Sequence, residues 1–206
     1  MNETTRIPAS TSLSAWLDKL AQPDGAPGGG AACGVMLALS AALLRIVAEY
    51  TPDDERAEEC AARLVTRRVD ALDTAETDGV RSAELGAALR TPTDDPDRDE
   101  RVRDAATEAA RLSAALGDIG VGLIDELRLL GEIGNPHLAA DLAVAGEALA
   151  AGIAGASINL RANVSLARAH GAREELATLQ ADIERLRSAR AAAARIADET
   201  AARFDD

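Results

Sequence analysis

Hydrophobic side chains recur every three or four residues along most of the chain, which is the spacing of one face of an α-helix. The pattern predicts six helices, over about residues 12–22, 29–49, 53–89, 97–132, 136–169 and 171–204. Glycine, proline and acidic residues cluster between these segments, as is typical of turns and helix starts. Because the connections are short, successive helices should run in opposite directions. The expected fold class is therefore all-α, an antiparallel bundle of about six helices.

Two of the predicted helices differ in how their apolar residues are arranged. The segment 29–49 is apolar on nearly all sides, so we expect it to run through the middle of the fold. The segment 171–204 keeps its apolar residues on one face, which is typical of an outer or partner-facing helix. No repeat of the length used by solenoids is visible. We expect one domain over residues 1–206, with a polar and frayed stretch at 1–11.

Composition supports helices and narrows the class of function. Hydrophobic residues make up 47% of the 206 residues but aromatic residues only 1%, so the core must consist mainly of Ala, Leu, Val and Ile. The net charge is −13 and Lys19 is the only lysine, which argues against nucleic acid as a partner. No stretch of 18 or more residues is apolar and also free of charge and glycine. We expect a soluble, cytoplasmic protein without a membrane partner.

Cysteine and histidine give no metal-binding pattern. Cys33 and Cys60 lie far apart and have neither CxxC spacing nor the density of a disulfide framework, so we expect buried free thiols. His137 and His170 belong to no paired-ligand motif, and a lone histidine more often caps or packs. The prediction is no metal site and no permanently bound cofactor.

A glycine-rich turn opens the helix over 29–49. Proline at position 27 is followed by Gly28, Gly29 and Gly30, which can take positive φ and let another group approach closely. The first amides of the helix lack partners within the helix, so they could hold a polar or anionic part of a ligand, aided by the helix dipole. The alternative is that the turn only lets two helices pack closely.

A stripe of small residues runs along the helix over 136–169. Its members fall at steps of three and four: Asp141, Ala145, Ala148, Gly152, Gly155 and Asn159. The stripe is small in the middle and polar at its ends, so another helix, of this chain or of a second subunit, can approach it closely.

Three segments resemble one family, the cyclodeaminase and methenyltetrahydrofolate cyclohydrolase enzymes of one-carbon metabolism. Residues 26–32 look like its Pro-Gly-Gly-Gly-Ser signature, residues 134–141 are similar to its Gly-Asn-Pro-Asn and following Asp, and residues 155–164 look like its Gly-Ala-Ala-Leu-Asn-Val-Arg-Ile-Asn-Leu. Order and separation also match, over roughly residues 14–190. The resemblance implies a helical bundle that forms a homodimer, with a site for a tetrahydrofolate derivative near the subunit interface.

The reactions of that family need carboxylates. The reacting carbon lies between two nitrogens, and either opening of the ring by water or loss of ammonia requires proton transfer near a cation. Asp141 and Asp78 are the candidates for this role. The predicted substrate-binding residues are Gly28, Gly29, Gly30, Asn135, Asn159, Arg161 and Asn163.

Asn159, Arg161 and Asn163 lie on one predicted helix but cannot all point the same way. Asn159 and Asn163 share one helix face, and Arg161 lies opposite, where it would reach another subunit or a carboxylate. Structural roles are the alternative for all three, because buried asparagines that satisfy helix ends would show the same pattern.

The chain also departs from the family pattern. Ala31 stands where the family has serine, Ser82 where it has phenylalanine, and Leu89 and Thr93 where it has tyrosine and lysine. These changes remove aromatic surface and positive charge that a pterin ring and a glutamate tail would use. Two alternatives therefore stand beside a folate enzyme: a divergent member acting on another nitrogen-containing small molecule, and a non-catalytic helical binding module.

Overall fold

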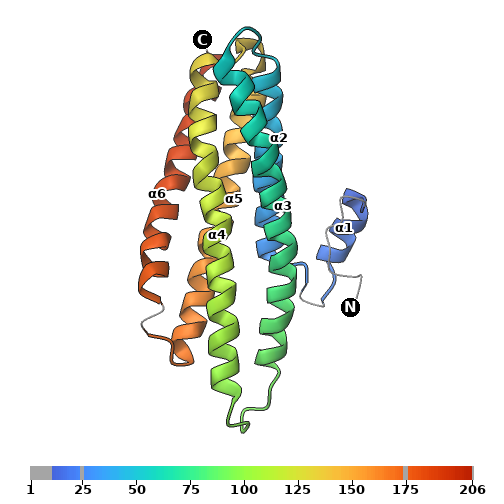
Figure 1. Cartoon of the computed structure of the whole chain (residues 1–206), viewed down its shortest axis with the longest axis vertical. Helices are drawn as coiled ribbons and strands as arrows, with labels where there is room; N and C mark the ends of the chain where they lie inside the picture. The colour runs from blue at the N-terminus through green and yellow to red at the C-terminus, as the bar shows by residue number, and fades with distance from the viewer. Residues whose placement is uncertain (1–10, 24–25, 174–175, 206) are drawn as a thin grey trace.

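The computed structural model describes residues 11–23, 26–173 and 176–205. These residues contain six α-helices and two short 3-10 helices (Figure 1). In chain order they are α1 (Leu13–Leu20), α2 (Gly29–Glu49), α3 (Glu55–Leu89), α4 (Arg98–Ile133), η1 (Pro136–Leu138), α5 (Ala139–Ala169), α6 (Leu176–Ala201) and η2 (Ala202–Phe204). No strand occurs in the described residues, so the predicted all-α class is confirmed.

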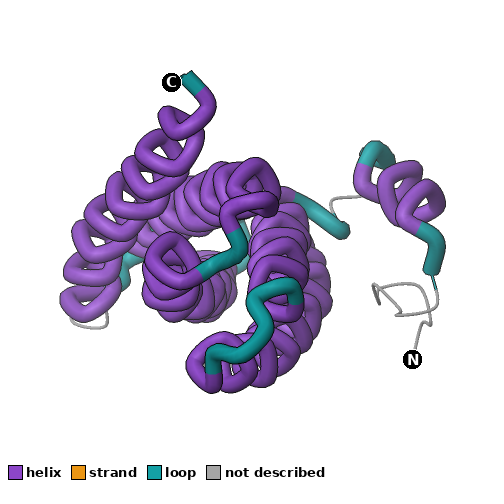
Figure 2. The backbone as a smooth tube through the Cα atoms, turned by 90° about the horizontal axis from the view of Figure 1, so that it is seen from above, coloured by secondary structure: helices purple, strands orange, loops and turns teal. Residues whose placement is uncertain are grey.

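Helices α2 to α6 form an elongated bundle in which successive helices run in opposite directions (Figure 1). Helix α4 packs against α3 and α5, and α5 packs against α2, α4 and α6. The short helix α1 lies to one side of the bundle in both views (Figures 1 and 2). The antiparallel bundle is therefore confirmed, whereas the prediction of a frayed segment at 1–11 falls almost wholly outside the described residues.

The helix boundaries follow local capping. Ser12 accepts a hydrogen bond from the Ala15 amide at the start of α1, and Asp54 accepts one from the Arg56 amide at the start of α3. The last helix begins later than predicted. Gly171 takes φ +97, a left-handed conformation that ends the helical backbone after α5, and α6 starts at Leu176 instead of residue 171.

The centre of the bundle is α5, which corrects the expectation for α2. Helix α2 buries Leu37, Leu44 and Val47 but leaves Leu39 and Ile46 about half exposed, at 54% and 47%. It therefore lies on one side of the bundle, with an apolar outer face. The reason is that α5, rich in small residues, is contacted on three sides and takes the central place.

The stripe of small residues brings α5 against α2. A Cβ on Gly152 would lie 2.7 Å from Leu37 Cδ2, and one on Gly155 would overlap Cys33 Sγ. The small residues therefore hold two helices of one chain together. Cys33 and Cys60 are both buried and free, as predicted.

Two segments are long and apolar enough to cross a membrane, namely 29–49 and 136–169, with mean hydropathies of 2.1 and 1.5. About half of each window, 56% and 50%, is buried in the bundle. Core helices of soluble proteins pass the same test, so this finding is weak support for a membrane span.

Candidate functional site

The N-cap residue of α2 provides no side-chain cap. Gly28 is the N-cap residue, in an extended conformation with φ −129 and ψ −159, and it makes no side-chain hydrogen bond. The first amides of the helix, at Gly29 and Gly30, have no carbonyl partner within the helix. The turn does not use the positive φ that glycine permits, because Gly171 is the one described glycine with positive φ.

Glycine at position 30 is required by the close approach of Asp78. A Cβ at Gly30 would overlap the Asp78 carboxylate, which α3 places directly over the first turn of α2. The two helices approach closely one turn further on as well, where a Cβ on Gly34 would lie 2.7 Å from the Ala71 carbonyl oxygen. Small residues on α2 thus fix the position of the carboxylate.

Asp78 is a buried acid without a cationic partner. Asp78 is 6% exposed, and none of the ion pairs between described residues includes it. Burial raises the pKa of Asp78, while hydrogen bonds from the Ser82 hydroxyl and the Ala31 amide act to lower it. The Ser82 oxygen lies 3.4 Å from Asp78 Oδ2. An acid with a raised pKa exchanges a proton more readily near neutral pH than an exposed aspartate does.

Asn159 approaches the same turn from α5. A Cβ on Gly29 would lie 3.6 Å from both Asn159 Nδ2 and Asn159 Oδ1, which is ordinary contact. Asn159 Nδ2 lies 3.8 Å from Cys33 Sγ, and the thiol of Cys33 donates to the Gly29 carbonyl at 3.0 Å. Burial and the nearby Asp78 charge raise the pKa of Cys33 to about 11, so this thiol stays neutral.

Trp16, the only tryptophan, covers the site from α1. It is 5% exposed and clusters with Ala31 on α2 and Ala75 on α3. Its indole Nε1 is buried and finds no hydrogen-bond acceptor among the described residues. A buried indole N–H ordinarily has a partner, so this donor adds unused hydrogen-bonding capacity beside the start of α2.

Asn163 lies one turn beyond Asn159. Its Nδ2 is 3.4 Å from Ser113 Oγ on α4, and Ser113 donates to the Ala109 carbonyl at 2.9 Å. Both asparagines are partly buried, whereas Arg161 is exposed on the other side of α5, as helical spacing predicted.

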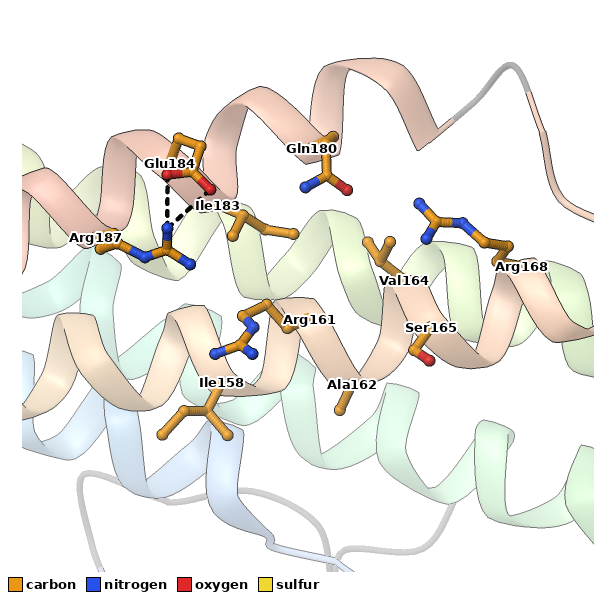
Figure 3. Close-up of a pocket in the computed structure, with 10 residues that line it drawn as sticks. All are labelled: Ile158, Arg161, Ala162, Val164, Ser165, Arg168, Gln180, Ile183, Glu184 and Arg187. Atoms are coloured by element: carbon orange, nitrogen blue, oxygen red, sulfur yellow. Dashed lines mark hydrogen bonds and ion pairs between the residues drawn. The ribbon is translucent and has the colours of Figure 1, made fainter.

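Arg161 lines an open groove between α5 and α6, with a volume of about 530 Å³ (Figure 3). Arg168 and Arg187 line the same groove, together with Gln180 and Ser165. Arg187 donates to both carboxylate oxygens of Glu184, at 3.1 and 2.9 Å.

Asn135 and Asp141 lie at the opposite end of α2. Asn135 donates from its backbone to Thr51 Oγ1 at 3.0 Å and from its side chain to the Tyr50 carbonyl at 2.9 Å. Its side-chain oxygen accepts from the His137 amide at 3.0 Å. These bonds join the turn before α5 to the end of α2. A substrate-binding role for Asn135 stays a prediction.

Within one chain, Asp141 is remote from Asp78. Asp141 is partly buried in the first turn of α5 and lies eighteen residues before Asn159 on the same helix. At 1.5 Å per residue this separation is about 27 Å. The structure therefore brings Gly28, Gly29, Gly30, Asp78 and Asn159 together, and leaves Asn135 and Asp141 at the other end.

Three residues of the site were not singled out from the sequence as functional: Trp16, Cys33 and Ser82. For Trp16 the available signal was that it is the only tryptophan in a chain that is 1% aromatic. Ser82 follows Asp78 by one helical turn, which also could have placed it beside the carboxylate. In the described part of the chain, no group of three or more His, Cys, Asp or Glu side chains is placed to hold a metal ion.

Comparison with known proteins places these features in a family. Residues 12–182 match the family model described as formiminotransferase-cyclodeaminase. No curated protein matches the chain. Among solved structures, the chain is similar to formiminotetrahydrofolate cyclodeaminase from Thermotoga maritima, with a TM-score of 0.81 and 21% identity. The match covers 93% of this chain and 96% of the Thermotoga chain, and at this identity it shows a shared fold.

Proposed function

The chain belongs to the formiminotransferase-cyclodeaminase family, and from this membership we propose that it is an enzyme acting on the amidine carbon of a tetrahydrofolate derivative. Two reactions fit: hydrolysis of the methenyl bridge, and closure of that bridge from a formimino group with loss of ammonia. The observation that supports the proposal is the buried carboxylate of Asp78, which lies against the first turn of α2 and has no cationic partner among the described residues.

Asp78 would transfer the proton in either reaction. In hydrolysis, water forms a bond to the cationic carbon and Asp78 takes one proton from it. Asp78 returns this proton to the departing nitrogen as the C–N bond breaks, and the remaining hydroxyl proton goes to solvent as the carbonyl forms. In ring closure, the bridging anilino nitrogen attacks the formimino carbon while protonated Asp78 gives its proton to the formimino nitrogen. Asp78 then takes the proton of the attacking nitrogen and passes it to the same departing nitrogen, and the C–N bond breaks as ammonia leaves. A positioned acid or base of this kind typically contributes about 10² to 10⁴ in rate.

The groups around Asp78 would position the substrate. The first amides of α2 and the Trp16 indole are donors, and the Asn159 amide can both donate and accept. Together they can match the alternating donors and acceptors of a pterin ring. Because the pKa of Asp78 is raised, this carboxyl group can hold a proton and donate it to the leaving nitrogen of the substrate.

A homodimer would give Asp141 a place in the same site. Helices α2 and α5 pack side by side, and each leaves apolar side chains exposed, including Leu39, Ile46 and Val144. We propose that these faces pair about a two-fold axis with the two α2 helices antiparallel. The end of α2 that carries Asn135 and Asp141 would then meet the start of α2 in the other subunit.

The dimer is tested by sedimentation. Leu39→Glu should convert a dimeric parent into a monomer, because a charge would have to be buried in an apolar interface. Ala181→Glu, at an exposed position on α6, should leave the sedimentation coefficient of the parent unchanged. A parent that is monomeric at assay concentrations contradicts the dimer.

The sharing of the site between subunits is tested by complementation. Asp78→Asn and Asp141→Asn should each lower turnover, and co-expression of the two variants should restore part of it. Each hybrid dimer would have one site with both carboxylates intact. If the co-expressed protein is as inactive as each single variant, Asp141 is not part of a shared site.

The reaction itself is tested with the purified parent. Loss of the methenyltetrahydrofolate absorbance would indicate hydrolysis, and appearance of that absorbance with ammonia from the formimino compound would indicate cyclodeamination. Neither change with a folded parent would contradict the proposal. Asp73→Asn, which removes an exposed carboxylate from α3, serves as the control.

A further inference from the structure

The groove between α5 and α6, called here the arginine groove, has an unusual charge for this protein. The chain carries −13 overall, yet the groove is lined by Arg161, Arg168 and Arg187 against one acid, Glu184. Figure 3 shows Arg187 on α6 near Arg161 on α5, with Arg168 further along α5, beyond Val164. Like charges repel, so an anion bound among these arginines would relieve the repulsion.

The guanidinium groups keep donors available. Ion pairs between described residues engage Arg187 but neither Arg161 nor Arg168. Arg187 uses one terminal nitrogen on Glu184, and a guanidinium has five N–H donors. Gln180 and Ser165 add neutral hydrogen-bonding groups. A ligand with two carboxylates suits this set, because guanidinium matches carboxylate geometry.

The floor of the groove is apolar. Val164 and Ile183 face each other there (Figure 3) and are 3% and 5% exposed. A cationic rim above an apolar floor fits a ligand that joins a flat apolar ring to carboxylates. A simple inorganic anion would leave the floor unused.

The arginine groove begins next to the candidate site. Ile158, which lines the groove, directly precedes Asn159, whose amide faces the first turn of α2. Arg161 lies on the other side of α5 from Asn159, but the exposed side chain of Ile158 lies between the two sides, and the rise along the helix axis from Asn159 is only about 3 Å to Arg161 and about 14 Å to Arg168. A single extended ligand could therefore have its reacting end at α2 and its charged end in the groove.

We propose that the arginine groove binds the aminobenzoyl-glutamate tail of the folate substrate, with the ring on the apolar floor and the two carboxylates on the arginines. The proposal rests on the proposed function, since it names the part of the substrate that this surface recognises.

Calorimetry with a fragment tests the groove without turnover. p-Aminobenzoyl-glutamate contains the tail but not the reacting ring, and p-aminobenzoate lacks the glutamate. The parent should bind the first about tenfold or more tightly than the second, and added salt should reduce the difference. The double variant Arg161→Gln/Arg187→Gln should lose about tenfold or more in affinity for the glutamyl fragment.

A matched variant controls for charge alone. Arg190→Gln/Arg195→Gln removes the same two charges from exposed positions of α6 that do not line the groove, and it should leave fragment affinity unchanged. In kinetics, Arg161→Gln/Arg187→Gln should raise KM for the glutamyl substrate more than KM for a substrate without glutamate. A purely structural role for the arginines would raise both equally.

The outcomes separate the two proposals. Fragment binding that depends on the arginines, without turnover of any folate, supports the groove and contradicts the proposed function. If the parent turns over the folate, and Arg161→Gln/Arg187→Gln has the same fragment affinity and the same ratio of KM values as the parent, the result supports the proposed function and overturns the groove proposal. Equal affinity of the parent for the two fragments also overturns it.

Discussion

Two carboxylates of this protein are equally buried but differ in their hydrogen-bond partners and in the direction of their pKa shifts. Asp78 and Glu126 are each 6% exposed. Glu126 accepts two hydrogen bonds from Arg63, at 2.7 and 2.9 Å, whereas Asp78 has the Ser82 hydroxyl and the first turn of α2. Burial acts to raise the pKa of both groups, but hydrogen bonds from Arg63 and Cys60 outweigh it at Glu126, whose pKa is lowered.

The difference separates a structural acid from a candidate catalytic one. A carboxylate that is neutralised by arginine stays ionised and holds α3 against α4. A carboxylate that is buried without a cation can gain and lose a proton, and it attracts a cationic substrate. Burial alone therefore does not indicate a site, whereas burial without an ion pair does.

The largest expected effect is on turnover. Asp78→Asn should lower kcat by about 10² to 10⁴, because the variant cannot transfer a proton. Glu126→Gln, at an equally buried position, should change kcat by less than about tenfold once folding is confirmed by circular dichroism. A similar loss of turnover in both variants would remove the distinction between the two acids.

The next effect is steric and concerns the two glycines under Asp78 and Asn159. Gly30→Ala would overlap the Asp78 carboxylate and should cost about 1–3 kcal/mol of unfolding free energy, with loss of turnover. Gly29→Ala meets Asn159 at 3.6 Å and should stay within about 0.5 kcal/mol of the parent. Urea unfolding measures both, and equal stabilities would show that Asp78 can move aside.

The sequence predicted the frame of this comparison. Helical spacing gave the bounds of α2 as residues 29–49, and the glycine turn at its start indicated a site. Resemblance brought in Asp78, forty-eight residues after Gly30. Spacing alone could not show that α3 lays this acid over that glycine, because the contact depends on how two helices pack.

Other parts were wrong or missed for physical reasons. The prediction that α2 is central was wrong because the small residues of α5 let three other helices pack closely around α5. The distance between Asp141 and Asn159 was already implied by their eighteen-residue separation on one predicted helix. Glu126 is one of several acids on α4, and periodicity does not tell which of them finds an arginine on α3.

A smaller effect should follow at the structural acid. Glu126→Gln should lower the free energy of unfolding by about 1–2 kcal/mol, because it replaces a two-point bond to Arg63 with a weaker one. The value is modest because the Arg63 side chain is 47% exposed. Glu59→Gln removes the other partner of Arg63, 3.7 Å away and 66% exposed, and should cost less than about 0.5 kcal/mol. Equal costs in urea unfolding would mean that burial of Glu126 adds nothing.

The smallest effect is the most diagnostic, because the two acids should respond to pH with opposite signs. The pKa of Asp78 is raised in the folded protein, so its contribution to stability is present at low pH and is lost as pH rises through the folded pKa. The pKa of Glu126 is lowered, so its contribution is present above the unfolded pKa and is lost as pH falls through the folded pKa.

Thermal unfolding from about pH 4 to about pH 8 measures both trends. The Tm of Asp78→Asn relative to the parent should rise with pH, because the variant never has to bury a charge. The Tm of Glu126→Gln relative to the parent should fall with pH, because the parent gains its ion pair. If the Tm difference from the parent changes with pH in the same direction for both variants, the charge of Asp78 is stabilised in the folded protein as that of Glu126 is. Asp78 is then not supported as the proton-transfer group.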